Sequence, residues 1–153
     1  MSDRRVFIKA VAAVAGAAAL SSFSLAQAAD PVKVGFIYVS SVGDAGWTYQ
    51  HDVGRKEMEK ALGGKVVTKF IENVPEGADA ERVIRELAQS GHQIIFATSF
   101  GYMNYMDKVS KQFPKVTFMH ATGYKTGKNF GIYNARFYEG RYVNGVIAGK
   151  MTK

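Results

Sequence analysis

The chain has 153 residues, a length that suits about one domain. It contains no cysteine, which excludes disulfides and thiolate metal sites. The formal net charge is +7, but the basic residues are interspersed with acidic ones and form no run, so the charge pattern argues against nucleic-acid binding.

Residues 1–28 have the pattern of an export signal. Arg4 and Arg5 begin a basic segment, residues 11–20 are apolar and rich in alanine but too short to span a bilayer comfortably, and residues 26–28 form a small-residue cleavage site. The paired arginines also resemble the twin-arginine pattern, which directs export in a folded state. Asp3 stands where that pattern usually has Ser or Thr, so the general secretory route stays open.

The remaining residues, 29–153, are expected to form a soluble periplasmic domain. Without the signal, 17 basic and 12 acidic residues give a net charge of +5, which we interpret as a solvated surface. No cysteine follows the signal, so a lipid-attached form is not expected.

The first unit of this domain is a strand, a loop and a helix. The apolar, β-branched run from Val32 to Val39 predicts a strand buried on both faces. A glycine-marked loop follows over 40–46, and helical spacing then extends from Trp47 to Leu62 before two glycines. This order opens a doubly wound α/β layer, in which ligands bind at the carboxyl ends of the strands.

Trp47 is the only tryptophan of the chain and stands at the start of the predicted helix. A phosphate-binding loop would require small residues at this point. A flat aromatic side chain could stack on a flat ligand, or it could simply cap the helix at the edge of the core. The segment alone leaves both interpretations open.

The strand and helix alternation continues to the end of the chain and predicts a parallel sheet with right-handed crossovers. The third strand is short and almost wholly apolar, so we expect it to be central. The last helix carries Gly145 and Gly149, whose spacing would permit close packing, most often against a sheet. The expected strands are 65–71, 93–98, 116–120 and 129–134. The expected helices run from about Asp79 to just before Gly91, from Tyr102 to just before Pro114 and from about Tyr138 to Met151.

The sequence shows no catalytic or metal-binding motif. It contains no GxGxxG after the first strand, no phosphate-binding P-loop and no GxSxG, so no cofactor is expected. His51, His92 and His120 lack metal-site spacing. His92 is expected in a surface turn, and His51 is more often a packed or exposed histidine than a ligand-binding one.

The carboxyl ends of the predicted strands combine aromatic and polar residues. Aromatic faces supply stacking area, and hydroxyl, amide and carboxylate groups orient a ligand by hydrogen bonds. Singly each aromatic residue could close the rim of the sheet, but as a set they favour a site for a small, flat, polar ligand. The candidate ligand-binding residues are Tyr38, Asp44, Trp47, Thr48, Ser99, Phe100, Tyr102 and Asn134.

Three segments resemble the basic-membrane-protein family, the purine-nucleoside-receptor-like branch of ABC importer substrate-binding proteins. They are VKVGFIYVSSVGDAGWTYQHDVGRKEME, IIFATSFGY and FGIYNARFYEGRYVNGVIAGKM, and the resemblance covers 29–153. It implies a periplasmic-binding-protein-like type I fold with two Rossmann-like lobes that close on a purine base or nucleoside. It also implies a non-enzymatic, monomeric protein whose partners are a purine ligand and an ABC permease.

The resemblance assigns roles to individual residues. Trp47 matches the family's stacking aromatic, Thr48 matches an adjacent Asn, and Ser99 and Phe100 match the exit of the third strand. Tyr38 stands where relatives carry an acidic residue. The departures at Tyr38 and Thr48 fit a free nucleobase better than a ribose-bearing nucleoside.

The family pattern includes a second lobe of similar size, so we expect this sequence to represent an N-terminal lobe with the second lobe missing. Two other interpretations stay open. One is a small exported α/β hydrolase that acts on nucleosides, and the other is an inactive fragment.

Overall fold

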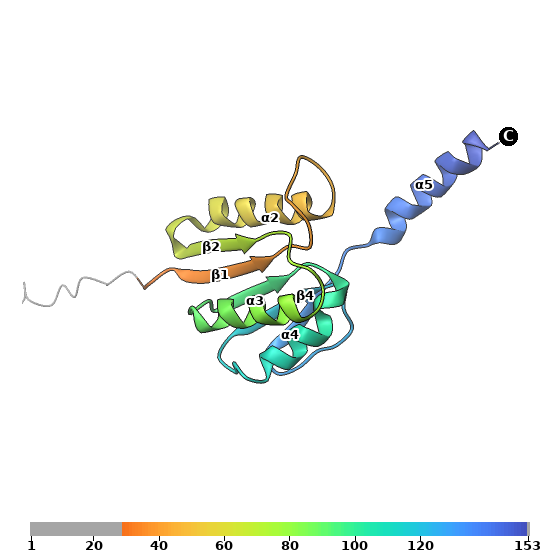
Figure 1. Ribbon diagram of the computed structural model, residues 1–153. Coiled ribbons are helices and arrows are strands. Elements are labelled where there is room, and N and C mark those ends of the chain that lie inside the picture. The colour runs from red at the N-terminus through yellow and green to blue at the C-terminus, as the bar shows by residue number, and fades with distance from the viewer. Residues whose placement is uncertain (1–28, 153) are drawn as a thin grey trace, which may run out of the picture. The chain divides into compact units, whose positions relative to one another are not determined.

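The computed structural model describes residues 29–152 (Figure 1), so the predicted export signal of residues 1–28 lies outside the described residues. The folded unit begins at Pro31 and alternates strands with helices. In chain order its elements are β1 (Val32–Ile37), α2 (Trp47–Leu62), η1 (Gly63–Lys65), β2 (Val66–Ile71), α3 (Ala78–Gln89), β3 (Ile94–Ala97), η2 (Phe100–Tyr102), α4 (Met103–Ser110), β4 (Thr117–Ala121), β5 (Phe130–Tyr133) and α5 (Phe137–Met151).

The five strands form one parallel sheet in the order β2-β1-β3-β4-β5. The predicted α/β class and parallel sheet are confirmed, and β3 is the central strand, as its apolar sequence indicates. The strand order reverses direction between β1 and β3, which makes this the topological switch point where doubly wound sheets bind ligands.

Helices cover the two faces of the sheet unequally. α3 and α4 lie on one face and α2 lies on the other (Figure 1). Successive side chains of a strand point to opposite faces of the sheet. Ile37 therefore packs against α3 and α4, whereas Phe36 and Tyr38 lie on the α2 face. The larger core therefore lies on the α3 and α4 face, and a smaller cluster lies under α2.

Two local expectations are wrong. The α-helical part of α4 ends at Ser110 rather than just before Pro114. Tighter i to i+3 bonds finish this segment, and the Asn129 amide nitrogen lies within hydrogen-bond distance of the carbonyls of Ser110, Phe113 and Val116. His92 is buried rather than placed in a surface turn, because its ring packs beside Gly35, with Nδ1 2.9 Å from the Leu87 carbonyl.

The last helix, α5, has no buried residue. Apolar side chains such as Tyr142 and Ile147 are exposed, so the expected packing of this helix against the sheet is absent from the described chain. Within residues 29–152 no helix is both long and apolar enough to span a bilayer.

Candidate ligand-binding site

A cavity of about 590 Å³ lies at the carboxyl ends of the strands. It is bounded by the first turns of α2, by the ends of β4 and β5 and by the start of α5. Its volume suits a small organic ligand. The lining residues are Gly46, Trp47, Gln50, His51, Ala121, Thr122, Tyr133, Asn134, Ala135 and Phe137.

Trp47 is held in place at the edge of this cavity. Gly46 has a φ of 94°, a conformation that a side chain would strain, and this turn sets the start of α2. The indole Nε1 donates a hydrogen bond to the carbonyl of Thr98, just beyond β3, so the ring bridges α2 and the central strand. The side chain is 39% exposed and lines the cavity, which leaves ring surface available for stacking.

Two rings contact Trp47, and a third, that of Tyr133, contacts one of them. The His51 ring centroid lies 4.6 Å from that of Trp47, and the Phe137 centroid lies 5.8 Å away. The rings of His51 and Tyr133 pack edge to face, with their centroids 6.0 Å apart. Burial raises the pKa of the Tyr133 phenol, so this side chain is neutral at physiological pH and acts as an apolar wall with a hydroxyl group.

Polar groups line the same cavity. Asn134 accepts a hydrogen bond from the Ala135 amide through Oδ1, so its Nδ2 remains a donor. Thr122 has a φ of 64° and donates its hydroxyl hydrogen to the Ala121 carbonyl. Gln50 adds an amide at the edge, and the arrangement combines flat apolar walls with a few oriented polar groups.

The structure places two of the predicted site residues, Trp47 and Asn134, on this cavity, although they are far apart in the sequence. Tyr133, Phe137 and His51 were missed or undervalued as site residues. Two signals for them existed: His51 follows Trp47 by one helical turn, and Tyr133 is the next-to-last residue of a strand predicted to end at the same edge as Trp47.

Three predicted site residues are buried and engaged by the protein itself. Tyr38 points toward α2, where its hydroxyl lies 3.5 Å from the Asp52 carboxylate. Thr48 is hydrogen-bonded to Ser40 at 2.7 Å, and the Tyr102 hydroxyl donates to the Val74 carbonyl within the core. None of the three lines the cavity, and contact of these side chains with a ligand stays a prediction.

The other predicted site residues lie outside the cavity lining. Ser99 donates its hydroxyl hydrogen to Glu76. Phe100 is 55% exposed, and its ring centroid lies 6.4 Å from that of Tyr124. Asp44 is exposed in the loop between β1 and α2. A role for these residues in ligand contact stays a prediction.

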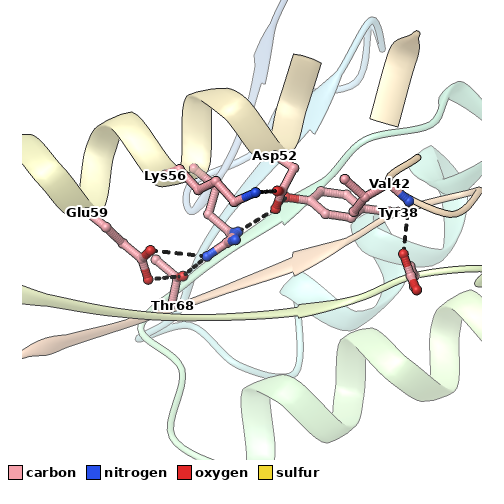
Figure 2. A network of polar contacts seen from close by, with 8 residues as sticks. Tyr38, Val42, Asp52, Lys56, Glu59 and Thr68 are labelled. Carbon is pink, nitrogen blue, oxygen red and sulfur yellow. Dashed lines mark hydrogen bonds and ion pairs between the residues drawn. The ribbon is translucent and has the colours of Figure 1, made fainter. Parts of the chain in front are cut away.

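α2 carries a network of charged side chains, of which Asp52 and Arg55 are buried (Figure 2). Arg55 Nε lies 2.7 Å from Asp52, while Lys56 approaches the same carboxylate at 2.9 Å. Burial alone would raise the pKa of Asp52, but the hydrogen bonds from Arg55 and Lys56 outweigh it and hold the pKa below its ordinary range. Arg55 also contacts Glu59 and Thr68, so the network ties α2 to β2.

The described chain contains no metal-binding cluster. Among residues 29–152, no group of three or more histidine, cysteine, aspartate or glutamate side chains is arranged to hold an ion.

Residues 31–153 match the model of a family described as ABC transporter substrate-binding protein PnrA-like. The chain belongs to this family. This confirms the resemblance found in the sequence, and it agrees with a parallel sheet whose carboxyl edge holds an open cavity.

Individual relatives agree with the family. A purine-binding protein from Brucella abortus is 63% identical over 128 residues, which are 84% of this chain and 37% of that protein. A putative ABC transporter glucose-binding protein, TsgA13, from Haloferax volcanii is 37% identical over 124 residues, or 81% of this chain and 31% of that protein.

A solved ABC transporter solute-binding protein from Conexibacter woesei has a similar fold. Its TM-score is 0.62 at 22% identity, and the match covers 77% of this chain and 40% of that one. The chain spans about a third of the length of the two curated relatives. The structural match is consistent with one lobe of such a protein.

Proposed function

We propose that this chain forms one ligand-binding lobe of the substrate-binding component of an ABC importer, and that its cavity takes a purine base. The family and the relative named as purine-binding support this proposal. The observation that carries it is the indole of Trp47, which is fixed by the Thr98 carbonyl and lines the cavity beside two further rings. A planar heterocycle can stack on such a surface.

In a protein as long as its relatives, the rest of the polypeptide would supply the opposite wall of the site. A ligand that touched both lobes would bias an equilibrium between open and closed forms, and the closed form would dock on the permease. In this proposal the protein carries out no reaction, and the ligand leaves unchanged.

Calorimetry with adenine, guanine, hypoxanthine and their nucleosides tests the proposal. We expect the purified chain to bind a free base. Replacing Trp47 with Ala should weaken binding by about 5- to 150-fold, because base stacking on an aromatic side chain contributes roughly 1–3 kcal/mol. Trp47→Phe should retain most of the affinity. Equal binding by the Ala variant, or no binding of any purine, would contradict the proposed site.

Two alternatives can be tested on the same purified chain. The relative named as glucose-binding favours a sugar ligand, and tighter binding of glucose than of any purine would support that assignment. A nucleoside hydrolase would convert a nucleoside to its free base during incubation, which chromatography detects.

We further propose that residues 1–28 export the protein to the periplasm by the twin-arginine route. The arginine pair and the apolar stretch that follows it support this proposal. Fusing the segment to a reporter and replacing both Arg4 and Arg5 with Lys should abolish export of the folded reporter. Unchanged export would favour the general secretory route.

A further inference from the structure

His51 is the residue of the cavity whose hydrogen-bonding state the structure defines most fully. It lies one helical turn after Trp47, and its ring stands between those of Trp47 and Tyr133. The side chain is half-buried and lines the cavity. The ring is therefore fixed in orientation by packing on two sides.

The partner of Nδ1 identifies the tautomer. Nδ1 lies 2.9 Å from the backbone carbonyl of Trp47, and a carbonyl oxygen can only accept a hydrogen bond. In the neutral imidazole the hydrogen is therefore on Nδ1, which leaves Nε2 with a free lone pair. No residue among 29–152 forms a hydrogen bond with Nε2, so an oriented acceptor remains at the cavity wall.

Other polar groups of the cavity can also accept a hydrogen bond. Asn134 accepts from the Ala135 amide through Oδ1, and the Thr122 hydroxyl donates to the Ala121 carbonyl while its oxygen keeps its lone pairs. The Gln50 amide lies on the exposed surface of α2, where no described residue holds it in one orientation. His51 differs from these groups because its acceptor belongs to a ring that contacts Trp47, so it lies beside the surface on which a flat ligand would stack.

We infer that His51 is a specificity-determining residue, whose Nε2 accepts a hydrogen bond from an N–H group in the plane of a heterocycle stacked at Trp47. The inference rests on the proposed function. A ligand with a methyl group in place of that N–H would leave the lone pair buried without a partner, which costs binding free energy. His51 would thus select ligands by their pattern of N–H donors.

The test measures binding of three related bases to the purified chain and to variants of His51. Adenine has both a ring N–H and an exocyclic amine, 9-methyladenine lacks the N9–H, and unsubstituted purine lacks the amine. His51→Phe keeps a flat ring against Trp47 and Tyr133 but removes the acceptor. His51→Gln places an amide oxygen near the position of Nε2, whereas His51→Asn reaches only the position of Nδ1.

We expect His51→Phe to weaken adenine binding about 5- to 10-fold, the effect of one lost hydrogen bond. For one of the other two bases the loss should shrink to less than about twofold, and that base identifies the N–H that His51 accepts. His51→Gln should restore binding better than His51→Asn. The Gln and Asn variants provide the same comparison if the Phe variant does not fold.

Equal losses for all three bases, or no loss for any of them, would overturn the role of His51 while leaving purine binding in place. A chain with native His51 that binds none of the three bases would instead overturn the proposed function, and the inference with it. Urea unfolding of each variant shows whether a loss of affinity reflects a loss of folded protein.

Discussion

At the scale of single residues, His120 makes the stability of the lobe depend on pH. It is fully buried on β4, where Nε2 donates to the Ser99 carbonyl at 2.7 Å and Nδ1 has no partner among the described residues. Burial lowers its pKa, and burial also lowers the pKa of His92. The unfolded chain therefore binds protons at these sites more readily than the folded one.

The lowered pKa values of His120 and His92 make the folded lobe less stable in acid. The stabilising contribution of the neutral rings is fully present above the unfolded pKa of about 6.5 and is lost as the pH falls through the lower folded values. We expect the free energy of unfolding, measured with urea, to fall between about pH 7 and about pH 5. His120→Phe should reduce this slope, and an unchanged slope in the variant would show that His120 does not contribute.

Gly123 is required by its contact with the same histidine. A Cβ at this position would overlap His120 Nδ1 and would lie 3.2 Å from the sulfur of Met103, and both of these side chains are buried. Gly123→Ala should therefore destabilise the lobe by about 1–3 kcal/mol.

Gly127→Ala is the matched control for that substitution. Its Cβ would meet Phe130 at 3.6 Å, an ordinary van der Waals contact, so we expect a change within about 0.5 kcal/mol. Urea unfolding compares the two variants. Equal stabilities would show that His120 shifts to accommodate the extra methyl group.

At the scale of elements, α2 depends on the pairing of Arg55 with Asp52. Both side chains are buried, and the Arg55 guanidinium also lies 4.9 Å above the Phe70 ring. Arg55→Met should destabilise the lobe by roughly 3 kcal/mol, because it leaves a buried carboxylate whose remaining partners are the exposed Lys56 and a long hydrogen bond from Tyr38.

A second substitution separates the loss of the pair from the loss of packing. Asp52→Asn combined with Arg55→Met removes both charges and should recover part of the stability in the urea experiment. A double variant less stable than the sum of the single ones would contradict this account. The experiment at neutral pH avoids interference from Asp52 titration, since its lowered pKa affects stability only in acid.

The exposed apolar surface of α5 makes association between chains the expected behaviour of this polypeptide, in contrast to the monomer expected from the family. Tyr142 is 75% exposed, and Val143, Val146 and Ile147 are also exposed. Apolar surface that is contiguous and open to water favours interfaces or aggregation. Light scattering should therefore show a mean mass that rises with protein concentration.

Substitutions on α5 test this expectation. Val146→Glu together with Ile147→Glu should reduce the association. Lys150→Glu is the control, because it changes charge on the same helix and leaves the apolar side chains in place. A monomer at every concentration, or an equal effect of the control, would contradict a role for the apolar residues.

At the scale of the whole molecule, apolar patterning predicted the elements well and the site only in part. The spacing of apolar residues and the glycines at the ends of elements are local properties of the sequence. They were enough to predict the sheet, its central strand and the place of Trp47 at the start of a helix. The burial of Tyr38 and Tyr102 could not be predicted, because the partners of a tyrosine hydroxyl depend on tertiary packing. Phe137 was missed since its contact with Trp47 joins distant segments.

The one tryptophan of this chain gives the lobe an intrinsic optical probe. Its indole nitrogen is tied to the carbonyl beyond β3 while its ring contacts Phe137 at the start of α5. A molecule that settles over the indole displaces water from it, and a tilt of α5 changes which ring lies beside it. Both events alter the wavelength and intensity of the fluorescence, so occupancy and motion of this lobe can be followed without attaching a dye.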